Sequence, residues 1–226
     1  EVGVDDADER MVKSPFDYQH NMQVRIMSDF PEPQSRDRSL YLKCLFLTID
    51  MAARSMEGGT LVLFTNYADL EYCYHNLRSP WSKLGRSVYA QGQGFARSEL
   101  RSRMLEEGDV LLLGAESFWK GFDAKGSCLS RVILTRLPFE NPGHPIMEAK
   151  TERLEAEGKS SFLEITIPKA VIRFRQGIGR LIRSHTDMGD LLILDSRILH
   201  KRYGFHFLSE LPNRDFKTEQ MQEIIG

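Results

Sequence analysis

The residues best suited to chemistry share one face of a helical pattern over residues 168–184, PKAVIRFRQGIGRLIRS. At about 100° per residue, apolar side chains form one stripe, and the opposite stripe gathers cations and one amide. The members of this polar stripe are Lys169, Arg173, Gln176, Arg180 and Arg183. Guanidinium groups offer a planar fork of donors that fits phosphate oxygens, so the stripe indicates phosphate binding. An amphipathic helix with a solvated polar face is the plain alternative, because most runs of charge are of that kind.

Two details favour the ligand-binding interpretation of this helix. Within the helix, the polar stripe has no Asp or Glu at i±4, which a face that serves only stability tends to have. Gly177 and Gly179 interrupt the helix, and each costs about 1 kcal/mol of helix stability. A helix tolerates that cost more readily where another backbone or a ligand approaches closely.

The elements that must position this helix follow from the apolar pattern. Strands are expected at 60–65, 87–90, 110–114, 131–136, 164–167 and 190–195, and helices at 40–57, 66–79, 95–107, 145–158 and 168–184. Several strands are continuous Val/Ile/Leu runs, which indicates that both of their faces are covered. Strands that alternate with helices predict an α/β fold, a three-layer sandwich with a mostly parallel central sheet. Ligands of such sheets bind at the carboxyl ends of the strands.

Length and composition restrict the class of protein to which the chain can belong. With 226 residues, 41% hydrophobic and 27% charged, the chain is expected to be an ordinary soluble globular protein, and no run approaches a membrane span. The acidic first residues argue against a signal peptide, and the missing initial Met predicts a piece of a longer polypeptide. Three scattered cysteines indicate a reducing, cytoplasmic compartment without disulfides. No Cys or His pair has metal-ligand spacing, so no metal site is expected.

The nucleotide-binding loops of other α/β proteins are missing from the sequence. A phosphate loop reads G-x-x-x-x-G-K-[ST], but the stretch from Gly121 to Gly126 is followed by Ser127. A dinucleotide fingerprint would need a third glycine after Gly177 and Gly179, and Ile182 stands there. A nucleotide would therefore have to be bound by other groups of this chain.

The sequence QGIGRLIR over 176–183 resembles motif VI, Q-x-x-G-R-x-x-R, of superfamily 2 helicases of the DinG/XPD group. In that family both arginines reach the phosphates of ATP held by the other motor domain. The resemblance implies that Arg180 contacts the γ-phosphate and that Arg183 is the arginine finger, with Gln176 beside them. A residue of that kind accelerates phosphoryl transfer by about 10³–10⁵.

A second stretch, SFWKGFD over 117–123, resembles motif V of the same family, S-F-W-E-G-x-D, with Lys120 where Glu is common. The resemblance places Ser117, Trp119 and Lys120 near single-stranded DNA, and gives Gly121 and Asp123 the coupling of DNA to the ATP cleft. Core packing is the alternative for the two aromatic side chains. We assign it to Phe118 and leave it open for Trp119.

A third stretch, LVLFTNY over 61–67, is similar to motif IV of the family. It places Thr65 and Asn66 at a strand end, where hydroxyl, amide and main-chain N–H groups can hold phosphate oxygens. An ordinary helix cap is the alternative for Asn66. Gln91 and Arg97 are expected as further DNA contacts.

The resemblance extends over most of the chain and implies a domain organisation. Residues 40–226 would form the second RecA-like helicase domain, and residues 1–39 a leading segment that continues from an upstream motor domain. The family's phosphate loop and any iron–sulfur cluster belong to that upstream half. ATP and Mg²⁺ would accordingly be bound mainly there, and this chain alone would not hydrolyse ATP.

The function that the resemblance implies is half of an ATP-driven 5′-to-3′ DNA helicase acting in DNA repair. Its partners would be single-stranded DNA and the upstream RecA-like domain of the same polypeptide, with no membrane. The rival hypothesis is a non-catalytic RecA-like module that binds nucleic acid or protein. An independent α/β enzyme, such as a dehydrogenase or methyltransferase, is disfavoured by the failed glycine fingerprint.

Overall fold

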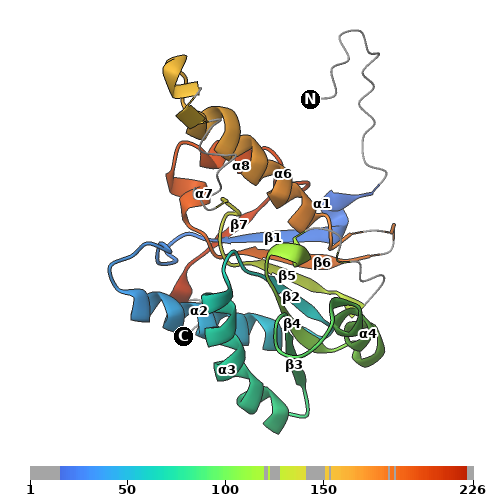
Figure 1. The fold of residues 1–226 in the computed structure, drawn as a ribbon. Coiled ribbons are helices and arrows are strands. Elements are labelled where there is room, and N and C mark those ends of the chain that lie inside the picture. The colour runs from blue at the N-terminus through green and yellow to red at the C-terminus, as the bar shows by residue number, and fades with distance from the viewer. Residues whose placement is uncertain are drawn as a thin grey trace.

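A seven-stranded, all-parallel sheet forms the centre of the fold (Figure 1). The computed structural model describes residues 16–119, 122, 128–140, 151–152, 154–182, 184–185 and 187–222. The strand order is β3-β4-β2-β5-β6-β1-β7, so β2 and β5 lie at the centre. All strands point the same way, and their carboxyl ends therefore meet at one edge of the sheet.

The strands and helices have well-defined bounds. The strands are β1 (Met22–Met27), β2 (Thr60–Leu63), β3 (Ser87–Ala90), β4 (Val110–Gly114), β5 (Arg131–Leu134), β6 (Gly189–Ile193) and β7 (Lys217–Glu219). The helices are α1 (Tyr18–Asn21), α2 (Arg38–Arg54), α3 (Tyr67–Lys83), α4 (Arg97–Glu107), α6 (Ile167–Ile178), α7 (Arg197–His200) and α8 (Gly204–Leu208). The described residues also include the 3₁₀ helix η1 (Glu116–Phe118) and the π-helix η3 (Phe162–Thr166).

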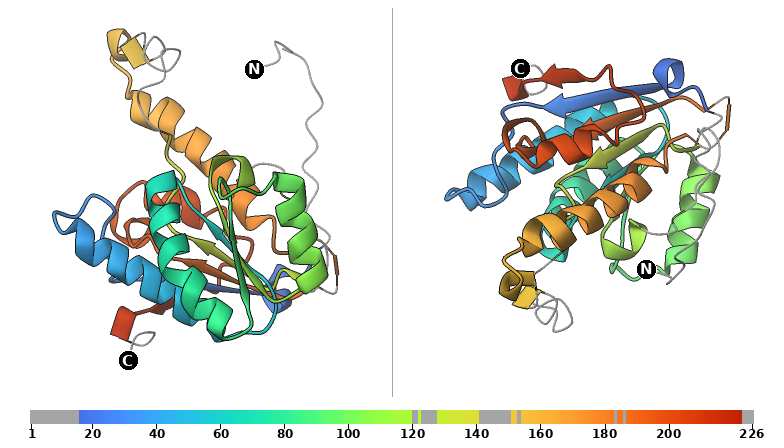
Figure 2. Two further views of the ribbon diagram at one scale, coloured as in Figure 1. Left: turned by 60° about the horizontal axis from the view of Figure 1, so that its bottom comes forward. Right: turned by 90° about the horizontal axis from the view of Figure 1, so that it is seen from above.

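Helices cover both faces of the sheet and make a three-layer sandwich (Figures 1 and 2). One core contains the buried faces of α2 and α3, and the other contains those of α4, α6, α7 and α8. The central strands β2, β4, β5 and β6 are buried at every position, because apolar layers lie on both sides. The predicted α/β class with a parallel sheet is confirmed, and so are five of the six expected strands. Within the described residues, no helix is both long and apolar enough to cross a bilayer.

The strand expected at 164–167 is wrong. These residues belong to η3 and to the first turn of α6, which together form one continuous helix. Pro168 lies inside this helix, where a proline removes a hydrogen bond and crowds the carbonyl four residues before it. The residue four positions before Pro168 is Glu164, which lies in the π-helix η3. The wider turn of a π-helix gives its carbonyl more room and relieves the crowding. Of the helix expected at 145–158, residues 151–152 and 154–156 are helical, residues 157–158 form a turn, and the rest lies outside the described residues.

Part of the leading segment 1–39 lies in the central sheet. Its residues 22–27 form β1, which lies in the sheet between β6 and β7. Val24 and Ile26 are fully buried in the core. The apolar pattern does not reveal this strand because Arg25 interrupts it, although Arg25 is half-buried and paired. The fold therefore includes residues well before position 40, while residues 1–15 lie outside the described part.

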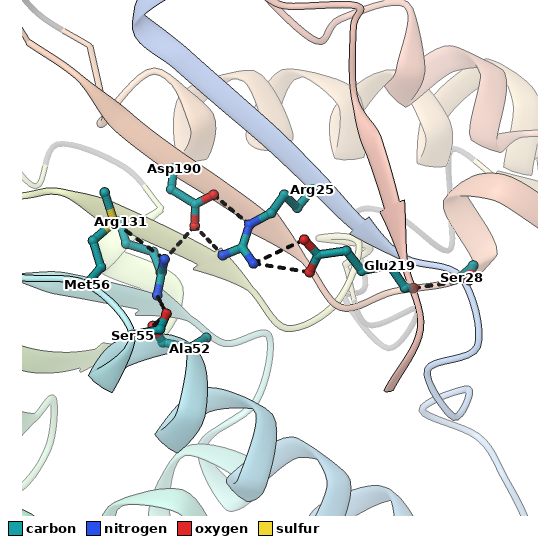
Figure 3. A network of polar contacts seen from close by, with 8 residues as sticks. All are labelled: Arg25, Ser28, Ala52, Ser55, Met56, Arg131, Asp190 and Glu219. Atoms are coloured by element: carbon teal, nitrogen blue, oxygen red, sulfur yellow. Dashed lines mark hydrogen bonds and ion pairs between the residues drawn. The ribbon is translucent and has the colours of Figure 1, made fainter. Parts of the chain in front are cut away.

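Arg25 and Arg131 share the carboxylate of Asp190 in a network that joins β1, β5 and β6 (Figure 3). Arg25 donates to both Asp190 oxygens at 2.7 and 2.6 Å and also to Glu219 on β7. The Arg131 Nε donates to Asp190 Oδ2 at 2.5 Å, and one terminal nitrogen reaches Ser55 at 3.1 Å. Burial lowers the pKa of Arg131, whereas the two carboxylates outweigh burial and raise the pKa of Arg25. Asp190 is therefore the carboxylate on which both buried cations depend.

We expect Asp190→Asn to destabilise the domain by about 3–5 kcal/mol, because it leaves the buried Arg131 without a carboxylate partner and Arg25 with Glu219 alone. Urea unfolding followed by circular dichroism measures this free energy. Glu219→Gln is the matched control, since Arg25 keeps Asp190 and the loss at a more exposed pair stays below about 1 kcal/mol. Equal effects of the two substitutions would contradict the central position of Asp190.

Candidate functional site

The carboxyl ends of four central strands bring the candidate residues to one edge. Leu63 of β2 pairs with Gly114 of β4 and with Leu134 of β5, which in turn pairs with Ile193 of β6. The segments that follow these strands therefore start side by side. In parallel α/β sheets this edge is where ligands bind.

Gln91 follows β3 and connects it to the segments after β2 and β4, through a set that we name the edge cluster, Tyr67, Gln91 and Ser117. Its Nε2 donates to the Tyr67 hydroxyl at 2.7 Å and to Ser117 Oγ at 3.0 Å. Its Oε1 accepts from the main-chain N–H of Ala115 at 2.9 Å. The structure thus brings together the sequence-predicted residues Gln91 and Ser117. It adds the exposed Tyr67, which ends the motif IV stretch but is not singled out by the sequence pattern.

Asn66 acts as the N-cap of α3, and Thr65 lies half-buried just before it. The Asn66 Oδ1 accepts from the Asp69 N–H at 2.8 Å, and its Nδ2 donates to the Asp69 carboxylate at 3.1 Å. Both ends of the amide are engaged, so the structure favours the helix-cap alternative for this side chain. The spacing N-x-x-D is a reciprocal capping pattern and could have revealed Asp69 from the sequence.

Asp69, in the first turn of α3, is a buried carboxylate that pairs with two arginines. It is 1% exposed and accepts hydrogen bonds from the guanidinium groups of Arg38 and Arg136. Both guanidinium carbons lie over the ring of Tyr41, at 5.1 and 4.9 Å from its centroid. Burial raises the pKa of Tyr41 to about 12, so its hydroxyl stays protonated and accepts from Arg136 Nε at 2.8 Å. These contacts join the start of α3 to α2 and to the segment after β5.

Trp119 lies in the core between β2 and α6. Its side chain is 0% exposed, and its Nε1 donates to the carbonyl of Phe64 at 2.7 Å. A Cβ added at Gly177 would come within 2.8 Å of Trp119 Cζ3 and 3.2 Å of Leu63 Cδ1. The structure thus favours core packing for Trp119, because a side chain without exposed surface offers no contact to DNA. The glycine that interrupts the helix is explained by this close approach.

Arg180 ties the end of α6 to the segment after η1. Its two terminal nitrogens donate to the carbonyls of Trp119 at 2.7 Å and Phe122 at 2.8 Å, and it is 9% exposed. These hydrogen bonds connect the stretch that resembles motif VI directly to the stretch that resembles motif V, although the two are far apart in sequence. Arg97 lies at the exposed start of α4, with its guanidinium carbon 5.7 Å from the centroid of the Phe118 ring.

Several predicted site residues remain untested by the geometry. Gln176 is exposed on α6. Lys120, Gly121, Asp123 and Arg183 lie outside the described residues. Among the described residues, no group of three or more His, Cys, Asp or Glu is arranged to hold a metal ion.

Comparison with known proteins gives one family and several relatives. The family described as the helicase C-terminal domain matches residues 49–214. "3'-5' exonuclease DinG" of Bacillus subtilis is 37% identical over 202 residues, which cover 89% of this chain and 22% of that protein. "ATP-dependent DNA helicase DinG" of Photobacterium profundum is 35% identical over 204 residues, covering 88% of this chain and 29% of that protein. "ATP-dependent DNA helicase YoaA" of Escherichia coli is 31% identical, covering 93% of this chain and 32% of that protein.

Solved structures agree in fold. An XPD helicase structure aligns with a TM-score of 0.70 at 16% identity and covers 88% of this chain and 35% of that chain. The predicted RecA-like arrangement is thereby confirmed. The chain spans only about a fifth to a third of the length of the relatives named above.

Gly177→Ala tests the close approach of α6 to the sheet. The added methyl group would press against the indole, and such overpacking costs about 1–3 kcal/mol, partly offset by about 1 kcal/mol of helix propensity. We expect a net loss of stability in thermal unfolding, with a change in Trp fluorescence. At Gly179 the nearest atom to an added Cβ is a carbonyl at 3.1 Å, so Gly179→Ala is the milder control. A stabilised Gly177→Ala variant would show that the helix does not need the glycine.

Proposed function

The chain belongs to the helicase C-terminal domain family of the DinG/XPD helicases, and from that premise we propose that it is the second motor domain of an ATP-dependent DNA helicase. The observation that carries this proposal is the contact of Arg180 with the carbonyls of Trp119 and Phe122. This contact joins the end of α6, which carries the pattern of phosphate-binding residues, to the segment around Trp119. Ser117 of the edge cluster lies two residues before Trp119 in that segment. A motor needs such a link, because nucleotide state must change the grip on DNA.

On the nucleotide side, we assign the arginine finger to Arg183. A guanidinium group can stabilise the charge that spreads over a transferring phosphoryl group. Arg180 has its terminal nitrogens committed to main-chain carbonyls, so it would have to release them to reach the γ-phosphate. Gln176, exposed near the end of α6, would hold the nucleotide or the attacking water. Gly121 and Asp123 would pass changes in the cleft to the DNA side.

The triphosphate and its Mg²⁺ supply the reactive phosphoryl group and its charge neutralisation. The absence of a phosphate loop from the sequence supports the assignment of both mainly to the upstream RecA-like domain. This chain's residues would then approach the phosphates from the opposite wall of the cleft. Closure excludes water and completes the site, and opening follows hydrolysis.

On the DNA side, we propose that Thr65, Gln91, Ser117, Arg97 and Lys120 follow the backbone of single-stranded DNA. Hydroxyl, amide and cationic donors are the groups that bind phosphate and sugar without reading bases. The exposed Tyr67 ring, held at its hydroxyl by Gln91, adds a surface on which a base can stack. Alternating closure of the cleft would then step the domain along the strand.

A 5′-to-3′ direction, a part in DNA repair and a cytoplasmic location complete the proposal. The three cysteines are all free and buried, which supports a reducing compartment. A non-catalytic nucleic-acid- or protein-binding module remains the competing function. The two differ in whether the polypeptide upstream of this chain hydrolyses ATP.

The Arg183→Ala variant tests the arginine finger in a polypeptide that contains this chain after its natural upstream sequence. We expect DNA-stimulated ATP hydrolysis to fall by about 10³-fold or more, since the developing charge loses its stabiliser. Arg175→Ala is the matched control, because this arginine is exposed and pairs with Glu210. The chain of 226 residues alone should be inactive. An Arg183→Ala variant with the wild-type rate, or hydrolysis by the chain alone, would refute the assignment.

Gln91→Leu tests the edge cluster. The substitution removes three hydrogen bonds that connect Tyr67, Ser117 and Ala115 while keeping the approximate volume. We expect single-stranded DNA affinity to fall by about tenfold, as the loss of one to two net hydrogen bonds implies. Fluorescence anisotropy with labelled oligonucleotide measures it. Asn76→Ala, on the exposed side of α3, serves as control, and unchanged binding of the Gln91 variant would exclude the cluster from the DNA path.

A further inference from the structure

Among the described cations of α6, Arg173 is the one that forms no ion pair with a described residue. Lys169 pairs with Glu140 at 3.6 Å, and Arg175 pairs with Glu210 at 3.1 Å. The guanidinium carbon of Arg173 instead lies 5.9 Å from the centroid of the Trp119 ring. Its charge is therefore not neutralised by the part of the chain that the structure describes.

The Nε of Arg173 is buried and has no hydrogen-bond partner among the described residues. A buried donor without an acceptor is destabilising, so such a group calls for an acceptor supplied by a ligand or solvent. The residue as a whole keeps part of its surface accessible. A ligand can therefore reach the side chain without unfolding the helix.

The position of Arg173 is set by contacts on both sides. Its helix is held against β2 by Gly177, and the aromatic ring beneath it is fixed by the hydrogen bond from Trp119 to Phe64. The aromatic face orients the guanidinium plane by a cation–π contact, which reduces the entropy lost on binding. The site lies where motif V and motif VI meet.

We infer that Arg173 is an additional phosphate-binding residue of the motor domain, one that donates to a phosphate oxygen and is positioned by the Trp119 ring. This inference rests on the proposed function and adds to it a residue three positions before the motif. A planar guanidinium without a counter-charge among the described residues fits a terminal or bridging phosphate oxygen. Two sources share this chemistry, the triphosphate of ATP and the backbone of single-stranded DNA.

The test uses Arg173→Met in the polypeptide with its natural upstream sequence, because Met keeps an unbranched chain over Trp119 and removes the donors. One measurement is the KM for ATP at saturating DNA. The other is the affinity for labelled single-stranded DNA without nucleotide at several salt concentrations. Arg175→Met is the matched control on the same helix, and Arg173→Lys tests whether charge alone restores binding.

A phosphate of ATP as the ligand predicts a KM raised by about tenfold with an unchanged salt slope. A DNA phosphate predicts a salt slope reduced by about 0.7, the share of one contact on a single strand. If KM, DNA affinity and salt slope all equal those of the wild type, the inference is overturned, even if the melting temperature falls. If the wild-type polypeptide itself lacks DNA-stimulated hydrolysis, the proposed motor function fails instead.

Discussion

The close approach between the backbone of Gly177 and the indole of Trp119 sets how near this part of α6 lies to the sheet. The indole is itself held by the carbonyl of Phe64 at the end of β2. Three sequence-distant segments are therefore fixed by one aromatic side chain: the end of a central strand, the segment after β4 and the helix with the cationic stripe. A side chain at position 177 would push the helix outward, and Arg180 could no longer reach both of its carbonyls.

Under the proposed function, this arrangement would let a nucleotide influence the proposed DNA-binding edge without any flexible connection. Packed cores respond to small displacements as units, because their side chains have few alternative arrangements. The edge cluster is reached from Trp119 through residues that adjoin it in sequence, Phe118 and Ser117. Asp69 and its two arginines join the start of α3 to α2 and to the segment after β5.

Much of the fold could be predicted from the sequence, since most of the strands from β2 to β6 are apolar runs separated by helical patterns. Strand β1 escapes prediction because a charged residue, Arg25, is buried in it with its partners, and such pairing across 165 residues leaves no local signal. The π-helix before Pro168 resembles a strand in sequence because β-branched residues fit both forms. At the site, the motifs locate the right segments, whereas roles within them depend on burial. Whether Trp119 and Asn66 point outward or inward is decided by contacts that the motif itself does not encode.

Strand β7 protects the sheet against self-association. It has three residues, and it pairs in parallel with the second half of β1, whose Ile26 and Met27 are fully buried. Without β7, the main-chain N–H and C=O groups of an apolar strand would lie open at the edge, which is a template for pairing with another chain. The exposed Lys217 places a charge at this rim, and charge discourages the addition of a further strand. Proteolytic trimming just before residue 217 would therefore leave a domain prone to aggregate, although every residue of the candidate site would still be present.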